Sequence, residues 1–306
     1  FGQRFDLPLL IAPTAFQALA CPAGELATAG AAAAAGTATV LSTLSSHELE
    51  SVAAAHAAAA RADGPPPWFQ LYPHRDTAIT DDLIARAEAA GYGALVVTVD
   101  VPVQGRRERD AHNRFHLPPA ARPANLTRYV DLDDLSRERS GSSALDRLIA
   151  SSFPPDLSWA SIERMRSRTR LPLLLKGVLH PDDARRAPAH GVDGVIVSNH
   201  GGRQLDSAVA ALDALPAIAE VARDTDLVVL VDGGIRRGTD VLKALILGAR
   251  AVLIGRPMVW ALAWRGRAGG DHLLALLRGE IATSLALLGC QRLDELDPSH
   301  LVRIAP

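Results

Sequence analysis

Eight short apolar runs, rich in β-branched residues, recur at nearly even spacing along this 306-residue chain. Each run is followed by a polar or Gly-containing turn and, in most cases, by an Ala- and Leu-rich stretch with a helical pattern. Runs this apolar are typical of parallel strands that are buried on both faces. Eight such units in one chain of this length predict an α/β fold of the (β/α)₈ TIM-barrel type rather than a doubly wound sheet. The predicted strands cover residues 8–12, 39–41, 68–71, 94–99, 172–175, 194–197, 227–231 and 251–254.

The connections between these runs are even in length except between the fourth and the fifth. There, residues 109–156 are polar and rich in Pro, Arg and Ser, and the connection is about twice as long as an ordinary crossover. A mobile lid over the strand ends and a disordered surface loop both fit such an insertion. We expect residues 1–306 to form a single barrel domain. Its predicted helices cover residues 24–35, 47–60, 79–90, 159–169, 181–190, 212–223 and 239–247.

Charge and cysteine content argue against several classes of protein. The formal net charge of -2 gives no basic field that would attract nucleic acid. Cys21 and Cys290 lie far apart, which fits neither a disulfide framework nor a zinc site, and the histidines lack the spacing of metal ligands. No apolar run reaches the roughly 18 residues of a spanning helix, and residues 1–4 (FGQR) do not have the pattern of a signal peptide, which is a charged segment followed by an apolar stretch. We therefore expect a cytoplasmic protein with no metal site and no membrane segment.

The residues that follow the predicted strands are unusually polar. In a (β/α)₈ barrel the active site lies at the C-terminal ends of the strands. Polar groups at the ends of buried strands need partners, and a polar ligand at this rim would supply them. In strand order the residues are Pro13, Thr14, Ala15, Ser42, Thr43, Gln70, Tyr72, Thr98, Asp100, Lys176, Ser198, Asn199 and His200.

Glycine and arginine follow the last two strands, in the segments 232–238 (DGGIRRG) and 255–256 (GR). Barrels commonly bind phosphate at this position, with backbone N–H groups and a helix N-terminus. Glycine lets the backbone approach an anion, and arginine supplies charge-assisted hydrogen bonds. Gly233 and Gly234 alone would fit a simple tight turn equally well, but together with Gly255 and Arg256 they favour a phosphate-bearing ligand.

Lysine is rare in this chain, in which Lys176 and Lys243 are the two lysines among 32 Lys and Arg residues. Lys176 ends the fifth apolar run, where a compact cation could lie beside a ring system that becomes anionic on reduction. A lysine that merely extends its ammonium to water from a strand end is the alternative. Its rarity favours a function.

The loop after the sixth strand contains both a possible base and a possible carboxylate anchor. His200 can accept a proton near neutral pH, and Arg203 can hold a carboxylate through two parallel hydrogen bonds. Asp100, after the fourth strand, could stabilise the imidazolium. Arg107 could add a second guanidinium, although its charged surroundings also fit a solvated run, and Tyr72 could either donate to the substrate or cap the core.

Three motifs carry a resemblance to a known family. They are residues 68–72 (WFQLY), 198–206 (SNHGGRQLD) and 232–240 (DGGIRRGTD). On these the chain resembles the FMN-dependent 2-hydroxy acid oxidase and dehydrogenase family, of the glycolate oxidase, lactate oxidase and mandelate dehydrogenase type. The similarity covers nearly the whole chain, from residue 7 to residue 290.

The resemblance implies a role for each candidate residue. His200 resembles the family's catalytic base and Asp100 its partner, while Arg107 and Arg203 resemble the carboxylate clamp and Tyr72 a substrate-binding tyrosine. Contacts to FMN are implied for Pro13, Thr14, Ala15, Ser42, Gln70, Thr98, Lys176, Ser198, Asp232, Gly234, Arg236, Gly255 and Arg256.

The implied reaction is oxidation of an (S)-2-hydroxy acid to the 2-oxo acid, with FMN as cofactor and oxygen or another redox partner as the final electron acceptor. Lys176 would stabilise the negative charge of the reduced flavin. The resemblance also implies a homo-oligomer, specifically a homotetramer.

Some positions depart from the family pattern. Leu44 stands where plant glycolate oxidases have Trp, and residues 103–115 look closer to mandelate-type members, so we expect a substrate bulkier than glycolate. The family's upstream segment, with a second substrate-binding tyrosine, has no counterpart here, and we expect it to be lacking. Other functions stay open at this point: an FMN-dependent isomerase or monooxygenase-type barrel, a flavin-binding barrel inactive without the upstream segment, and a phosphosugar-binding barrel.

Overall fold

The computed structural model describes residues 1–113, 117–118, 121–130, 148 and 150–302. Its strands form one eight-stranded sheet of parallel neighbours in the order β1-β8-β7-β6-β5-β4-β3-β2. An isolated parallel bridge between Ile11 and Thr39 joins β1 to β2 and closes the sheet into a barrel, which confirms the predicted fold class. The strands are β1 Leu9–Ile11, β2 Val40–Ser42, β3 Trp68–Leu71, β4 Leu95–Thr98, β5 Leu173–Val178, β6 Gly194–Val197, β7 Val228–Asp232 and β8 Ala251–Ile254.

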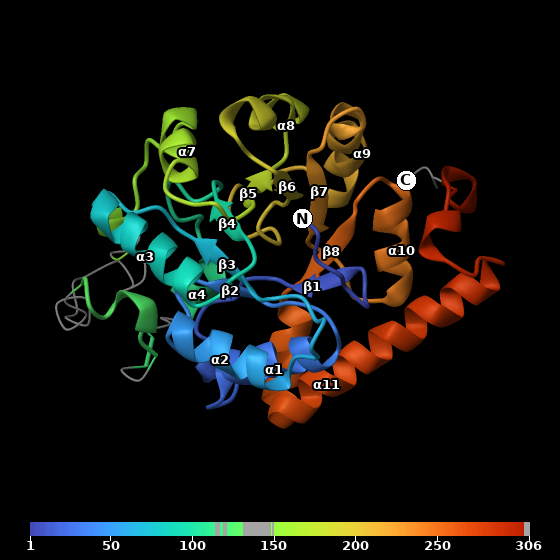
Figure 1. Ribbon diagram of the computed structural model, residues 1–306, viewed down its shortest axis with the longest axis horizontal. Helices are drawn as coiled ribbons and strands as arrows, with labels where there is room; N and C mark the ends of the chain where they lie inside the picture. The colour runs from blue at the N-terminus through green and yellow to red at the C-terminus, as the bar shows by residue number, and fades with distance from the viewer. Residues whose placement is uncertain (114–116, 119–120, 131–147, 149, 303–306) are drawn as a thin grey trace.

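Helices surround the strands, as Figure 1 shows. They alternate with the strands along the chain, because each crossover between parallel strands must return over the outside of the sheet. The helices are α1 Gly24–Ala34, α2 Leu49–Ala59, α3 Thr77–Ala89, α4 Glu108–His112, α7 Trp159–Arg166, α8 Pro181–Arg186, α9 Ala211–Ala222, α10 Gly238–Ile246 and α11 Arg256–Leu287. Short 3₁₀ helices are η1 Gln17–Leu19, η2 Ala124–Leu126, η3 Ala187–His190, η4 Leu293–Glu295 and η5 Pro298–His300.

Alternate residues of each strand pack into two separate cores. In β1, Leu10 belongs to a cluster of strand residues that fills the barrel, whereas Leu9 and Ile11 pack in the larger cluster that includes the helices. Val96 and Val97 of β4 divide in the same way. Full burial of one such side chain contributes about 1.5–3 kcal/mol. The double-sided burial explains why the strands appear in the sequence as continuous apolar runs.

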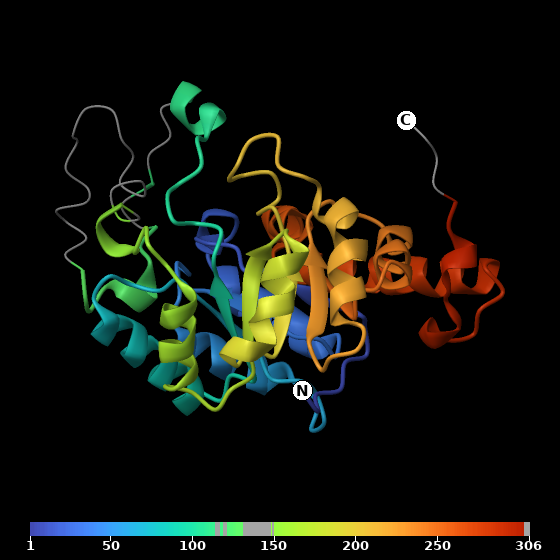
Figure 2. The same ribbon diagram turned by 90° about the horizontal axis from the view of Figure 1, so that it is seen from above.

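The C-terminal ends of the strands share one rim of the barrel. Figure 2 shows the segment that leads from β4 into α4 rising on the same side as the loop that follows β6. The chain starts on the opposite side. Parallel strands impose this arrangement, so every residue predicted to follow a strand is brought to the same edge.

Part of the predicted insertion is fixed to the barrel. Asn125 in η2 is fully buried, and its side-chain oxygen accepts a hydrogen bond from the backbone N–H of Leu49, 2.8 Å away, at the start of α2. Its amide nitrogen donates to the carbonyl of Thr43 and to Ser45 Oγ, at 3.2 and 2.9 Å. The lid and loop interpretations concern mainly residues 131–147, which lie outside the described residues.

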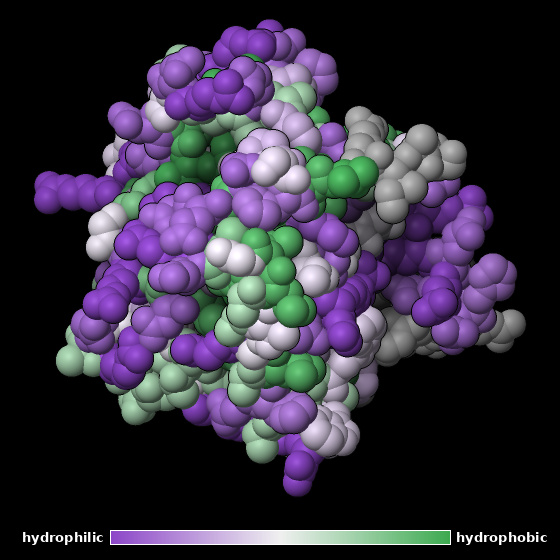
Figure 3. Space-filling model, turned by 90° about the vertical axis from the view of Figure 1, so that its right-hand side faces the viewer, coloured by the Kyte–Doolittle hydropathy of each residue, from purple (hydrophilic) through white to green (hydrophobic). Residues whose placement is uncertain are grey.

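The longest helix, α11, falls outside the helical stretches identified in the sequence. It changes direction at Arg265 and Gly266, whose backbone angles are not helical, and this Gly-containing interruption obscures its pattern. Trp260 and Trp264 on α11 are 58% and 60% exposed. Figure 3 shows the side of the molecule that lies to the right in Figure 1, where hydrophobic and hydrophilic residues are interspersed. Among the residues described, no helix has the length and apolar character needed to cross a bilayer.

Candidate active site

Strand register brings the candidate residues together at the rim in neighbouring pairs. Ser42 of β2 is paired with Gln70 of β3, and Thr98 of β4 is paired with Lys176 of β5. All four side chains are buried, as are Ser198 after β6 and Asp232 at the end of β7. The structure therefore gathers the residues predicted from strand ends into one polar cluster.

Lys176 forms a buried ion pair that the sequence did not indicate. Its Nζ lies 3.1 Å from Asp232 Oδ2 and donates to Ser198 Oγ, also at 3.1 Å. The two charged side chains are only 4% and 9% exposed. A buried charge is costly unless it is paired and hydrogen-bonded, so Asp232 and Ser198 keep this cation in place between three strand ends.

We expect Lys176→Met to lower the free energy of unfolding of the flavin-free protein by about 3–5 kcal/mol, since the buried Asp232 carboxylate would lose its partner. Urea unfolding measures the change. The other lysine supplies a matched control, because Lys243 is exposed and Lys243→Met should leave stability within about 0.5 kcal/mol of the parent. Equal stability of the two variants would contradict the prediction.

His200 and Asp100 are in direct contact. Nδ1 of His200 lies 3.0 Å from Asp100 Oδ1 and 3.2 Å from Oδ2, and the two side chains are 20% and 13% exposed. The backbone at His200 is left-handed, with φ of 58°, and Ser198 Oγ accepts a hydrogen bond from its N–H at 3.0 Å. A carboxylate on Nδ1 favours the tautomer with the proton on that nitrogen, which leaves the lone pair on Nε2.

A glycine makes room for Asp100 from the neighbouring strand. Gly177 of β5 has φ of 106°, and the register between β5 and β6 shifts at this point. A Cβ at Gly177 would lie 2.6 Å from Cβ and from Cγ of Asp100. A residue with a side chain at position 177 would therefore displace Asp100.

Tyr72, Arg107 and Arg203 lie in one electrostatic environment. Burial and the Asp100 carboxylate raise the pKa of Tyr72 well above its usual value, so its phenol is neutral and can donate. The pKa of Arg203 is lowered, mainly because its guanidinium is withdrawn from water and to a lesser extent because Arg107 repels its positive charge. Nε of Arg107 is buried without a hydrogen-bond partner in the described part of the chain. The three residues predicted to bind the substrate thus influence one another electrostatically.

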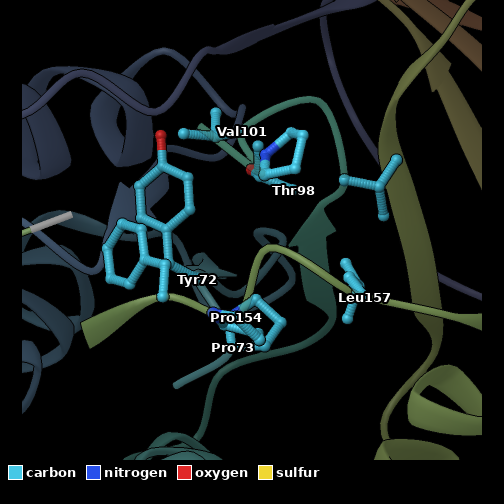
Figure 4. Close-up of a pocket in the computed structure, with 9 residues that line it drawn as sticks. Tyr72, Pro73, Thr98, Val101, Pro154 and Leu157 are labelled. Atoms are coloured by element: carbon cyan, nitrogen blue, oxygen red, sulfur yellow. The ribbon is translucent and has the colours of Figure 1, made fainter. Parts of the chain in front are cut away.

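An apolar pocket adjoins Tyr72. Phe153, near the end of the predicted insertion, stacks on the ring of Tyr72 with centroids 4.8 Å apart and meets His74 edge-on. Figure 4 shows Tyr72 beside this pocket, with Thr98 and Val101 from the β4 side and Leu157 opposite. The pocket is lined by Tyr72, Pro73, Thr98, Val99, Val101, Pro102, Phe153, Pro154 and Leu157.

The segments predicted to bind phosphate follow β7 and β8. Gly233 and Gly234 have φ of 94° and 80°, and Gly255 immediately precedes α11, whose first residue is Arg256. Arg256 donates to the carbonyl of Gly201 at 3.1 Å, which joins this segment to the His200 loop. Arg236 lies over the ring of Trp260, with its guanidinium carbon 5.2 Å from the centroid.

Two buried polar atoms show that a polar ligand fits this cluster. Within the described ranges, Nε2 of Gln70 and Oδ1 of Asp232 have no hydrogen-bond partner. The Oε1 atom of Gln70 accepts from the backbone N–H of Thr43 at 3.3 Å, which leaves the Nε2 donor available. Such unpaired atoms are costly unless a ligand satisfies them. FMN offers ring carbonyls for the amide donor and ribityl hydroxyls for the carboxylate, so the residues present fit this cofactor.

Thr43 and Gln204 organise the site and were not among the predicted site residues. Thr43 Oγ donates to the carbonyl of Gln70 at 2.7 Å and accepts from the N–H of Tyr72 at 3.0 Å. Gln204 binds the backbone of the β4 loop. In the sequence, Thr43 was recognised as a polar residue at a strand end and Gln204 as part of the motif at residues 198–206. Their contacts depend on loop geometry, which the sequence pattern does not show.

Comparison with known proteins supports one family. A family model described as FMN-dependent dehydrogenase matches residues 1–303. The chain is 52% identical over 300 residues to an L-lactate oxidase of Nostoc sp. (strain PCC 7120), covering 98% of this chain and 80% of that protein. It is 43% identical over 309 residues to 2-hydroxyacid oxidase 1 of Mus musculus, covering 100% of this chain and 80% of the relative. The crystal structure of mandelate oxidase with (S)-4-hydroxymandelic acid matches with a TM-score of 0.88 and 46% identity, over 96% of this chain and 79% of that one.

Proposed function

Because this chain belongs to the FMN-dependent dehydrogenase family, we propose that the rim of its barrel is where FMN and a 2-hydroxy acid meet. The chain is an FMN-dependent oxidoreductase that converts 2-hydroxy acids to 2-oxo acids. The observation that carries the assignment of the site is the contact of 3.0 Å between His200 and Asp100, beside two arginines that can hold a carboxylate.

FMN, when bound, accepts two electrons from the substrate and passes them on. Gln70 and Asp232 would hold it through their unpartnered polar atoms, and Gly234 and Gly255 allow the backbone to approach its phosphate. The other proposed contacts are Pro13, Thr14, Ala15, Ser42, Thr98, Lys176, Ser198, Arg236 and Arg256.

His200 is the proposed base. Asp100 accepts a hydrogen bond from the Nδ1–H of His200, so the lone pair on Nε2 can take a proton from the 2-hydroxy acid. The same carboxylate stabilises the imidazolium that results. In this arrangement Asp100 also fixes the ring in one orientation.

Arg107, Arg203 and Tyr72 are the proposed substrate clamp. Nε of Arg107 has no partner among the described residues and can donate to a carboxylate, and Arg203 can present two parallel N–H groups to the same group. Mutual repulsion between the two guanidinium groups is relieved when an anion lies between them. The neutral phenol of Tyr72 supplies a further donor.

Lys176 is proposed to supply a fixed positive charge beside the cofactor. Its contacts with Asp232 and Ser198 hold the ammonium at the strand end without motion during the reaction. A charge that is already in place costs no reorganisation when negative charge develops next to it.

The preferred substrate is proposed to be bulkier than glycolate. The likeness to a mandelate oxidase supports this proposal. Burial of each additional CH₂ group contributes about 0.8 kcal/mol, or roughly a fourfold gain in binding. We therefore expect kcat/KM to rise from glycolate to lactate to longer aliphatic or aromatic 2-hydroxy acids. Turnover of glycolate with none of mandelate or longer acids would contradict this.

One experiment tests the function and the acceptor together. The purified protein should show a flavin absorption band that bleaches when a 2-hydroxy acid is added without oxygen. Admission of air should restore the colour with consumption of oxygen, as expected for an oxidase; slow reoxidation would instead indicate another electron acceptor. A colourless protein that does not take up FMN would overturn the assignment.

A homo-oligomer, specifically a homotetramer, and a cytoplasmic location stay predictions. The exposed Trp260 and Trp264 on α11 are candidate contacts between copies of the chain. Sedimentation velocity of the flavin-loaded protein measures the assembly directly.

A further inference from the structure

Gln204 belongs to the motif at residues 198–206, and neither the cofactor nor the substrate assignment uses it. We propose that Gln204 is a positioning residue: its side chain fastens the loop after β6 to the loop after β4 and thereby sets the spacing of the groups that act on the substrate. This inference rests on the proposed function of those groups.

The amide of Gln204 is fully engaged with the β4 loop. Its Nε2 donates to the carbonyl of Asp100 at 2.7 Å and to the carbonyl of Val103 at 3.1 Å. Its Oε1 accepts from the backbone N–H of Gly105 at 3.2 Å. One side chain thus uses both of its N–H donors and its carbonyl oxygen on three backbone groups of a loop about 100 residues away in sequence.

The two loops also touch through their backbones. A Cβ at Gly105 would lie 2.5 Å from the carbonyl oxygen of Arg203 and 2.7 Å from Cα of Gln204. Contacts below 3.0 Å with backbone atoms cannot be relieved by rotation of a side chain. Glycine at position 105 is therefore required for the two loops to come this close. The amide of Gln204 holds them at this distance.

Each functional pair of the site is divided between these two loops. Asp100 lies on the β4 loop and His200 on the β6 loop, with 3.0 Å between carboxylate and ring. Arg107 is the last residue of the β4 loop before α4, and Arg203 immediately precedes Gln204 on the β6 loop. Repulsion from Arg107 contributes to the lowered pKa of Arg203. Like charges push the loops apart when no carboxylate is bound, and the three hydrogen bonds of Gln204 oppose this.

Gln204→Met tests the role, because methionine has a similar size and forms none of the three hydrogen bonds. Hydrogen exchange of the flavin-free protein should become faster in peptides covering residues 99–105 and stay unchanged in α9. In the flavin-loaded protein, we expect about tenfold weaker binding of the 2-oxo acid corresponding to the preferred substrate. Reduction of the flavin should be about 10²-fold slower, since displacements of about 1 Å have effects of this size.

A second variant reaches the same contact from the other loop. Gly105→Ala would force the loops apart while leaving Gln204 intact, and it should reproduce the changes of Gln204→Met. Because both substitutions remove one contact, the double variant should be about as impaired as the worse single variant. Gln291 is exposed, and Gln291→Met is the matched control expected to behave as the parent.

Two results would overturn the proposal. One is parent-like exchange at residues 99–105 together with parent-like binding and reduction in both variants. The other is lower thermal stability and flavin content with normal binding and reduction in the flavin-loaded fraction, which is the outcome of a purely structural role. If no 2-hydroxy acid bleaches the parent protein, the proposed function fails. The hydrogen-exchange measurements on the flavin-free single and double variants still decide whether Gln204 holds the two loops together.

Discussion

Replacement of His200 with Asn is expected to slow the reduction of flavin by a 2-hydroxy acid by about 10²- to 10⁴-fold, the range ascribed to a positioned general base. Asn is preferred to Ala because the backbone at position 200 has φ of 58°, a conformation that Asn tolerates better than most residues. The amide cannot take up the substrate proton, whereas Ser198 and Lys176, which are proposed to contact the cofactor, are unchanged. Anaerobic stopped-flow absorbance measures the rate.

The same substitution at an exposed histidine provides the control. His180 caps α8 by accepting a hydrogen bond from the N–H of Asp182, and Asn is a favourable residue at such a position. His180→Asn should reduce its flavin at the parent rate. A His200→Asn protein that retains its yellow colour and reduces within tenfold of the parent rate would show that another group is the base.

Replacement of Arg203 with Lys should lower kcat/KM by about 10²- to 10³-fold, because the two parallel hydrogen bonds from the guanidinium to the substrate carboxylate would be lost, and a hydrogen bond to a charged group contributes about 1.5–3 kcal/mol. Lysine keeps the charge but lacks the planar pair of N–H donors that matches a carboxylate, so this change isolates geometry from charge. Steady-state kinetics should show a raised KM together with a lowered kcat, since a loosely held carboxylate also misplaces the hydroxyl carbon relative to His200.

A change in the substrate sharpens this test. The methyl ester of the same 2-hydroxy acid has no carboxylate charge, so the difference between the parent and Arg203→Lys should largely disappear with the ester. Arg223 is an exposed residue paired with Glu220 on the surface, and Arg223→Lys should leave kcat/KM unchanged. If the ester shows the same gap as the acid, Arg203 does not bind the carboxylate.

The strands were predictable because their burial is simple. Residues that face the barrel interior and residues that face the helices are both apolar, so the pattern needs no knowledge of tertiary contacts. The exception is instructive: the fifth run was predicted to end at Leu175, but β5 extends to Val178. Lys176 and Gly177 interrupt the apolar pattern, and only pairing with β6 across a register shift shows that the strand continues.

Which residues lie at the rim of the barrel was also predictable, whereas the contacts among them were not. Chain order in a parallel barrel fixes which residues reach the rim, and this places Asp100 and His200 together although 100 residues separate them. The ion pair of Lys176 with Asp232 depends on which way two neighbouring side chains point. The hydrogen bonds of Gln204 depend on the path of two loops, which no periodicity encodes.

The bridge between Ile11 and Thr39 gives the barrel a seam. Neighbouring strands elsewhere are joined by registers of three or more residue pairs, whereas β1 and β2 meet through an isolated bridge. Local opening is easiest where backbone pairing is sparse, so breathing of the flavin-free barrel should start along this line. Proposed cofactor contacts lie on both sides of this junction, at residues 13–15 after β1 and at Ser42 of β2. A bound flavin would therefore link the two strands. The cofactor's contribution to heat resistance would then be concentrated where the cylinder is least securely closed.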